Sequence, residues 1–232
     1  MIPKKIHYCW YGNNKKSPLV RKCIESWKRN FPDYDIIEWN ESNTDIHVNG
    51  YVEEAYKNKK WAFVSDYIRM LVLYKYGGVY FDTDVEVLKP FPSEMMESDS
   101  FAGIESFTKE VSPGLVFACH KNNNIVKRVL ETYEGEKFEN ALMGRTKTIN
   151  VRITELLSKD GYVKEDRYQE IEGMRIFPSE IFCAYDGERR IQNPTENTLS
   201  IHHYAASWLP WYKKVKLRFG TMLRRLGYRK KR

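Results

Sequence analysis

Long apolar stretches are missing from this sequence of 232 residues. Its apolar runs extend over only a few residues, and a helix that crosses a bilayer needs roughly 20, so the sequence excludes such a helix. No apolar leader follows the first residues, and we expect no signal peptide. Only 9 prolines and 13 glycines are present, which excludes a disordered or fibrous chain. The length suits one domain with a sizeable core.

Cysteine is also scarce, and its spacing is uninformative. The four cysteines, Cys9, Cys23, Cys119 and Cys183, form no CxxC pair. This spacing gives no sign of a zinc site. We expect four reduced thiols in a cytoplasmic protein, with two disulfides as the less favoured alternative.

Acidic residues are absent from the last twenty positions. Residues 213–232 hold ten of the 38 Lys and Arg residues, so residues 1–212 carry 28 basic against 31 acidic groups. The formal net charge of +7 therefore belongs to a basic tail on a slightly acidic body. We predict a domain over 1–212 and a separate tail over 213–232.

The first eighty residues alternate between strand and helix signals. Residues 2–10 and 34–39 read as strands, and Ser17 followed by Pro18 starts a helix that ends near Asn30. This order predicts a right-handed βαβ unit with a parallel sheet. Residues 51–76 read as helices with an interruption at 58–60, and Gly77-Gly78 ends the second helix before a strand at 79–81. Weaker signals predict strands near 100–104, 115–118, 175–177 and 198–204, and helices near 123–133 and 148–158.

Two carboxylates, Asp82 and Asp84, follow the apolar strand at 79–81. In a continuing strand they would share one face and repel each other, and a divalent cation would remove that repulsion. In an open α/β sheet, ligands bind beyond the carboxyl ends of the strands, which is where this pair lies. The alternative is a polar strand exit with two solvated aspartates.

The surroundings of this pair resemble a known family. Residues 61–87 resemble the signature of the DXD glycosyltransferases, and more narrowly glycosyltransferase family 32 and the large glucosylating toxins. Residues 6–12 resemble the opening strand of that family and residues 201–208 its closing segment. The resemblance implies an α/β fold of the GT-A type: a nucleotide-binding sandwich with a mainly parallel central sheet flanked by helices. It also implies Mn²⁺ or Mg²⁺ and a nucleotide-sugar donor, with a UDP-sugar favoured and a GDP-sugar as the alternative.

The resemblance also implies roles for individual residues. Asp84 is expected to bind the metal directly, and Asp82 to contact the metal or the ribose. Asp66 would bind sugar hydroxyls, and Arg69 would lie near the sugar or the diphosphate. On the residues alone, Asp66 and Arg69 could equally form an ordinary ion pair within one helix.

Six further residues are candidates for the expected site, and the resemblance suggests the roles of three of them, Tyr80, Ser207 and Trp208. Trp10 could stack on the base and Tyr80 could lie near the ribose, although either could be a core residue. Ser207 and Trp208 resemble residues that close over the diphosphate. His202 and His203 are adjacent on an expected strand, so at most one can face a metal. We favour His203 as the third ligand from its spacing to Ser207.

The function implied by the resemblance is transfer of a sugar with retention of its anomeric configuration. The acceptor would be a glycan or lipid-linked saccharide in surface polysaccharide synthesis, for example of a capsule. Three other functions stay open: a protein-glucosylating enzyme, a metal-dependent phosphohydrolase and a non-catalytic membrane- or nucleic-acid-binding module.

The tail has the pattern of a basic amphipathic helix. Apolar residues recur on one face among Lys and Arg, at Val215, Phe219, Met222, Leu223 and Leu226. We expect it to lie on an anionic membrane surface, which would place a cytoplasmic protein at the inner face of the membrane. A helix docked on the body is the alternative. No nucleic acid is expected as a partner, because the body is net acidic.

Overall fold

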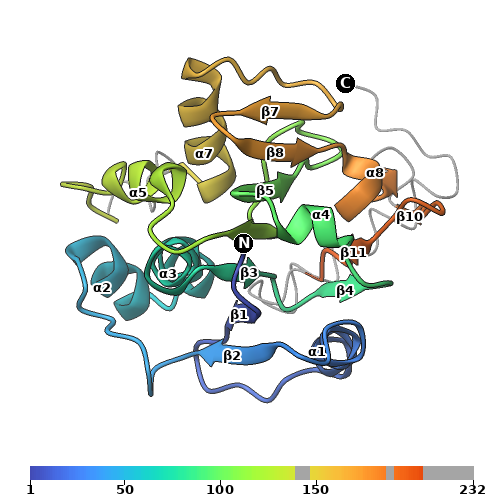
Figure 1. Ribbon diagram of the computed structural model, residues 1–232. Coiled ribbons are helices and arrows are strands. Elements are labelled where there is room, and N and C mark those ends of the chain that lie inside the picture. The colour runs from blue at the N-terminus through green and yellow to red at the C-terminus, as the bar shows by residue number, and fades with distance from the viewer. Residues whose placement is uncertain (139–146, 187–190, 206–232) are drawn as a thin grey trace, which may run out of the picture.

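The computed structural model describes residues 1–138, 147–186 and 191–205 of the chain (Figure 1). Ser207, Trp208 and the basic tail over 213–232 lie outside these residues. The predicted domain boundary at residue 212 therefore stays a prediction. Within the described part, no helix is long and apolar enough to cross a membrane.

A seven-stranded sheet forms the centre of the molecule, in the order β2-β1-β3-β6-β5-β8-β7. Strands β2, β1, β3, β5 and β8 point the same way, whereas β6 and β7 run antiparallel to their neighbours. The sheet is mixed with one dominant direction, and the predicted α/β class is confirmed. The strand bounds are β1 Lys5–Cys9, β2 Asp35–Trp39, β3 Gly78–Tyr80, β5 Ser100–Gly103, β6 Phe117–Cys119, β7 Gln169–Ile171 and β8 Met174–Phe177.

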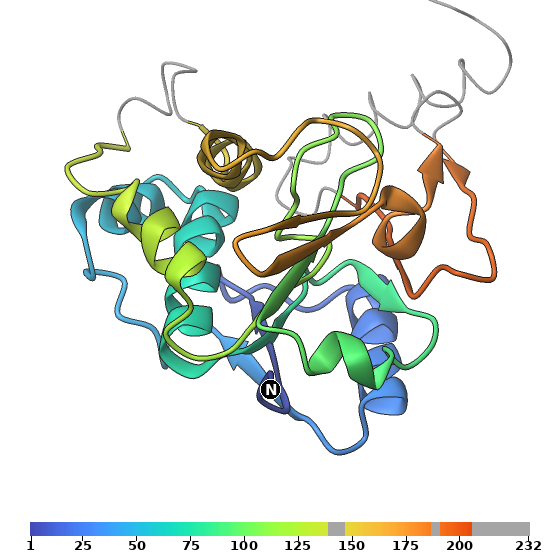
Figure 2. The same cartoon turned by 45° about the horizontal axis from the view of Figure 1, so that its top comes forward.

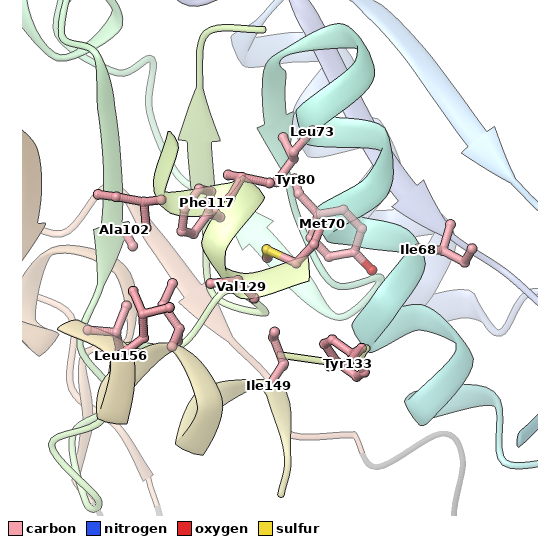
Figure 3. Packing of buried hydrophobic residues seen from close by; sticks show 14 of the residues in the cluster. Ile68, Met70, Leu73, Tyr80, Ala102, Phe117, Val129, Tyr133, Ile149 and Leu156 are labelled. Atoms are coloured by element: carbon pink, nitrogen blue, oxygen red, sulfur yellow. The ribbon is translucent and has the colours of Figure 1, made fainter. Parts of the chain in front are cut away.

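Helices cover both faces of this sheet (Figures 1 and 2). One face carries α2 Gly50–Lys57, α3 Trp61–Tyr76, α5 Asn124–Glu131 and α7 Ile149–Lys159. The other face carries α1 Pro18–Asn30, α4 Ser93–Met96 and α8 Ser179–Phe182. Each side buries its own hydrophobic core against the sheet. Figure 3 shows one of the two cores, where Met70 and Leu73 of α3 pack near Tyr80 and Phe117 of the sheet.

Local capping explains the helix ends that the sequence predicts. The Ser17 hydroxyl accepts a hydrogen bond from Val20 N at 3.3 Å, and Pro18 is the first residue of α1. Helix α3 ends at Gly77, whose φ of +63° suits a residue without a Cβ. Strands β1 and β2 pair in parallel around α1, which confirms the predicted βαβ unit.

A small two-stranded sheet extends the molecule beyond β3. Strand β4 Val85–Val87 pairs antiparallel with β11 Ser200–His202, which brings the end of the described chain to residues 85–87. The short elements β4, α4, β7, α8, β9 Tyr185–Asp186 and β10 Ile191–Gln192 were not predicted, because two to four residues carry too little periodicity.

His7 is a buried histidine on β1, between β2 and β3, and it is not exposed at all. Trp39 Nε1 donates to its Nδ1 at 3.1 Å, so its Nε2 carries the proton and donates to Gly77 O at 2.8 Å. Burial lowers the pKa of His7 to about 4. The neutral imidazole therefore ties β1, β2 and the end of α3 together.

We expect the free energy of unfolding to fall with acidification because of His7. In the unfolded chain its pKa is about 6.5, so the unfolded state binds the proton first as the pH falls. The part of the free energy of unfolding that depends on neutral His7 is fully present above pH 6.5 and is lost as the pH falls towards 4. The loss amounts to about 3 kcal/mol. Urea unfolding at several pH values measures it. His7→Gln should show a smaller acid loss than the parent, with His47→Gln at an exposed histidine as control. Equal acid losses in parent and His7→Gln would contradict the expectation.

Candidate active site

The two aspartates of the DXD motif lie in a turn and not in a continuing strand. Strand β3 ends at Tyr80, and Val85 N donates to Asp82 O at 3.0 Å, which closes a turn over residues 82–85. Asp82 N is held by Gly114 O at 3.0 Å. The turn lies at the carboxyl ends of the neighbouring strands β1 and β3, the edge where ligands bind in open α/β sheets.

Asp84 is the more enclosed of the two, with its side chain 14% exposed against 31% for Asp82. Its Oδ1 lies 3.1 Å from His202 Nε2, and its Oδ2 accepts a hydrogen bond from Ala205 N at 2.8 Å. Burial raises the pKa of Asp84, but the imidazole of His202 and the Ala205 N–H outweigh it, and the net pKa lies well below the ordinary value. Asp84 is therefore held as a carboxylate.

The pairing of β11 with β4 decides which histidine meets Asp84. His202 lies opposite Val85, so its ring reaches the carboxylate of the residue before. The neighbouring His203 points elsewhere, and its Nε2 lies 2.8 Å from Glu86 Oε2. The structure thus brings His202, and not His203, to the DXD turn. The spacing to Ser207 favoured His203, but alternation along a strand does not say which face turns towards the site, and the structure places His203 on Glu86 instead.

Arg69 connects helix α3 to the DXD turn. Its guanidinium lies between two carboxylates, with Nη2 3.0 Å from Asp66 Oδ1 and Nη1 3.2 Å from Asp82 Oδ1. It also lies over the ring of Tyr80, 4.8 Å from the ring centre. Burial opposes its charge, but Asp82 and Asp66 raise the pKa of Arg69 above its ordinary value. Arg69 is thus a buried cation that fixes the orientation of Asp82.

Asp66 is buried beside the start of α7. Its Oδ2 accepts a hydrogen bond from Ile149 N, the first residue of that helix, at 3.4 Å. Burial raises the pKa of Asp66 to about 6, although Arg69 opposes the shift. Asp66 and Arg69 form the ion pair that their spacing allowed, and Arg69 also reaches the DXD turn.

The two expected aromatic contacts lie in different surroundings. Tyr80 is fully buried, and its hydroxyl donates to Asp82 Oδ1 at 3.3 Å, so it supports the turn from inside the core. Trp10 follows β1 and is half-buried, with its Nε1 donating to Asn14 O at 2.8 Å. One residue that the sequence did not single out also contacts the turn: a Cβ at Gly114 would lie 2.2 Å from Asp82 Oδ2. The Ser112-Pro113-Gly114 turn before β6 is the signal that could have found it.

The donor set of this site suits a divalent cation. Asp82 and Asp84 offer carboxylate oxygens, and His202 in its neutral form offers an imidazole nitrogen, the ligand types of Mn²⁺ sites. Among the described residues, the buried His202 Nδ1 has no hydrogen-bond partner, so the ring is incompletely satisfied by that part of the chain. No group of three or more His, Cys, Asp or Glu side chains forms a ready-made metal site within the described residues. A cation held here would therefore take further ligands from a bound phosphate and water, as Mg²⁺ does in phosphate sites.

Comparison with known proteins agrees with this geometry. Residues 17–102 match the family model described as "Glycosyltransferase sugar-binding region containing DXD motif". Over 163 residues, 57% of this chain, it is 22% identical to "Subversion of eukaryotic traffic protein A" of Legionella pneumophila. Over 130 residues, 54% of this chain, it is 33% identical to "Toxin Afp18" of Yersinia ruckeri. The matches span 25% and 6% of these two relatives, so the chain is similar to a minor part of each.

Solved structures of glycosyltransferases share the fold. "PaToxG Glycosyltransferase" matches with a TM-score of 0.53 and 21% identity over 69% of this chain and 70% of that one. The galactosyltransferase LgtC in complex with donor and acceptor sugar analogues matches with a TM-score of 0.50 and 12% identity over 95% of each chain. The resemblance predicted from the sequence is confirmed: residues 17–102 are similar to a glycosyltransferase sugar-binding region with a DXD motif, and the chain shares the GT-A type of fold with solved glycosyltransferases.

Proposed function

We propose that this chain is a metal-dependent, retaining glycosyltransferase that moves a sugar from a nucleotide-sugar to an acceptor hydroxyl. The observation that carries the proposal is the pairing of Asp84 with His202, next to an Asp82 that Arg69 holds in place. This arrangement puts two carboxylates, one imidazole and one cation at the edge of the sheet where ligands bind. A UDP-sugar is the favoured donor and a GDP-sugar the alternative.

Each of these residues has a role in donor binding. Asp82, Asp84 and His202 would hold Mn²⁺ or Mg²⁺, in place of the set with His203 that the sequence spacing favoured. When bound, the cation offsets negative charge on the leaving diphosphate. Arg69 orients Asp82, Asp66 accepts hydrogen bonds from the donor sugar, and Trp10 offers its indole face to the base. Ser207 and Trp208 are proposed to close over the diphosphate.

The transfer step needs no carboxylate nucleophile. The acceptor oxygen forms a bond to the anomeric carbon on the face from which the diphosphate leaves, and its proton passes to an oxygen of that diphosphate. The described residues contribute by positioning both reactants, by holding Asp84 ionised and by excluding water. NMR of the product anomer tests this step, because an inverted product would contradict it.

The favoured acceptor is a glycan or a lipid-linked saccharide in surface polysaccharide synthesis. Attachment of residues 213–232 to an anionic membrane would bring the enzyme to a lipid-linked acceptor. A protein acceptor is the second candidate, because one of the relatives is titled a toxin. These acceptors differ in where the transferred sugar is found, on a saccharide or on a polypeptide.

A donor screen tests the proposed function. We expect the purified chain to release nucleoside diphosphate from one of UDP-glucose, UDP-galactose, UDP-N-acetylglucosamine or GDP-mannose in the presence of Mn²⁺ or Mg²⁺. EDTA should abolish the release and excess Mn²⁺ should restore it. If the chain cleaves p-nitrophenyl phosphate but releases no nucleoside diphosphate from any nucleotide-sugar, the result would contradict the proposed transferase activity and favour a phosphohydrolase.

A further inference from the structure

Three aromatic rings gather beside the candidate active site, and one of them faces solvent. Phe107, in the loop after β5, is 54% exposed, and its ring centre lies 5.7 Å from that of Tyr204 and 6.4 Å from that of Tyr185. The rings of Tyr185 and Tyr204 are 4.8 Å apart. We call Phe107, Tyr185 and Tyr204 the aromatic shelf. An exposed aromatic ring that continues into such a cluster is typical of a binding surface.

The aromatic shelf is in direct contact with the DXD turn. The ring of Tyr204 lies 4.2 Å from that of His202, edge to face at 89°. His202 is in turn 3.1 Å from Asp84. One imidazole therefore separates the shelf from the carboxylate that we assign to the donor diphosphate and its cation. A molecule on the shelf would lie beside the reacting end of the donor.

Buried groups hold the aromatic shelf in a fixed orientation. The Tyr204 hydroxyl donates to Glu105 Oε1 at 3.4 Å and lies 3.1 Å from Cys183 Sγ. Glu105 is only 9% exposed, and its Oε2 accepts a hydrogen bond from Thr108 Oγ1 at 2.7 Å. This buried acid follows β5 at the same edge of the sheet as Asp82.

The backbone beneath two of the rings is strained. Tyr204 has φ of +49°, and Ala184, which precedes Tyr185, has φ of +40°. Bulky residues rarely adopt such angles, and where they do the strain is usually maintained at a functional site. At Tyr204 the same conformation lets His203 N donate to Asp84 O and Ala205 N donate to Asp84 Oδ2. The segment 203–205 thus carries one ring of the shelf and also contacts the DXD turn.

The charges near the shelf favour an uncharged ligand. Lys109, two residues from Phe107, is ion-paired with Asp166 at 2.8 Å. Lys164 is ion-paired with Glu110 at 3.2 Å, and Glu105 is an acid. Among the described residues, an anionic group would therefore meet two lysines that are already paired. A sugar ring, by contrast, has an apolar face of C–H groups that suits an aromatic ring and hydroxyls that remain available to polar neighbours.

We infer that the aromatic shelf is the acceptor subsite, where the apolar face of a saccharide ring stacks on Phe107 while one hydroxyl of that ring faces the donor. The inference rests on the proposed function. It adds the place where the acceptor binds and a residue, Phe107, that selects for a sugar ring. Tyr204 and Glu105 are positioning residues of this subsite.

Two readouts on the full chain test the subsite. One is donor hydrolysis, and the other is transfer from the active donor to the methyl glycosides of glucose, galactose, mannose and N-acetylglucosamine. Phe107→Ala should raise the acceptor KM and lower the ratio of transfer to hydrolysis by about tenfold, the scale of one aromatic contact. Phe107→Trp should keep the parent KM, and its fluorescence should change saturably with the acceptor. Tyr76→Ala, at another exposed ring, is the control and should behave as the parent.

The outcomes separate this inference from the proposed function. A parent that neither hydrolyses nor transfers from any nucleotide-sugar refutes the proposed function itself. An active parent whose acceptor KM is unchanged by Phe107→Ala overturns the subsite alone. An active parent that transfers to a polypeptide and to none of the methyl glycosides also overturns the subsite. So does a Phe107→Trp variant that loses acceptor binding as Phe107→Ala does.

Discussion

Asp84→Asn should lower metal-dependent turnover of the nucleotide-sugar by about a thousandfold, the upper range for losing one preorganised charge in an active site. Asparagine has nearly the same shape and can still accept the hydrogen bond from Ala205 N. It carries no negative charge, however, and so loses both the attraction to His202 and its value as a ligand for a divalent cation. We therefore expect turnover to fall while the local structure is largely kept.

Steady-state kinetics of nucleoside diphosphate release at saturating Mn²⁺ measures this loss. Asp33→Asn is the matched control, because Asp33 is an exposed aspartate far along the chain from the turn. Thermal unfolding of both variants shows whether the fold is retained. A folded Asp84→Asn variant with turnover close to that of the parent would refute the assignment of Asp84.

Arg69→Met should lower the free energy of unfolding by about 3 to 5 kcal/mol at pH 7.5, the usual cost of removing one partner of a buried ion pair. Methionine fills much of the same volume, so the packing against Tyr80 is largely kept. The buried Asp66 and the partly buried Asp82 would then lie near each other without the cation between them. This uncompensated charge is what destabilises the variant.

The loss should depend on pH in a direction that follows from Asp66. Burial already raises the pKa of Asp66 to about 6, and removal of Arg69 takes away the group that opposes this rise. The pKa of Asp66 in folded Arg69→Met then lies above 6, so the penalty should shrink as the pH falls towards 6, where Asp66 becomes protonated in the folded variant. Urea unfolding between pH 5 and 8 measures it.

Two further variants make the Arg69 result specific. Arg69→Met combined with Asp66→Asn should recover part of the lost free energy, because one of the unpaired charges is gone. Arg128→Met is the control: Arg128 also bridges two carboxylates, those of Asp160 and Glu172, but at a partly exposed position where such pairs contribute little. Equal losses in Arg69→Met and Arg128→Met would contradict the view that Arg69 is needed as a buried cation.

The sequence predicts well those structural features that depend only on neighbouring residues. The start of α1 follows from Ser17 and Pro18, and the end of α3 follows from Gly77, because capping depends on a few neighbouring residues. The position of Asp82 and Asp84 follows from the strand before them. These features need no knowledge of distant pairing.

Contacts between segments that are far apart along the chain could not be predicted from the sequence. Whether His202 or His203 meets Asp84 depends on the register of β11 against β4, which a shift of one residue would reverse. The sequence did not indicate that Glu105 and Phe107 lie near the site, because this depends on how the sheet places the end of β5 beside the segment around Tyr204. Such pairings depend on the whole fold and leave no periodic trace in three or four residues.

Gly114 is as much a part of the DXD turn as its two aspartates, although the D-x-D pattern does not include it. A methyl group at position 114 would occupy the place of the Asp82 carboxylate without bringing any reactive chemistry of its own. In a related sequence, alanine at position 114 would thus displace the Asp82 carboxylate from its place in the turn while the D-x-D pattern itself stays unchanged. The missing side chain is therefore a condition for the geometry of the turn that a search for the two aspartates alone would overlook.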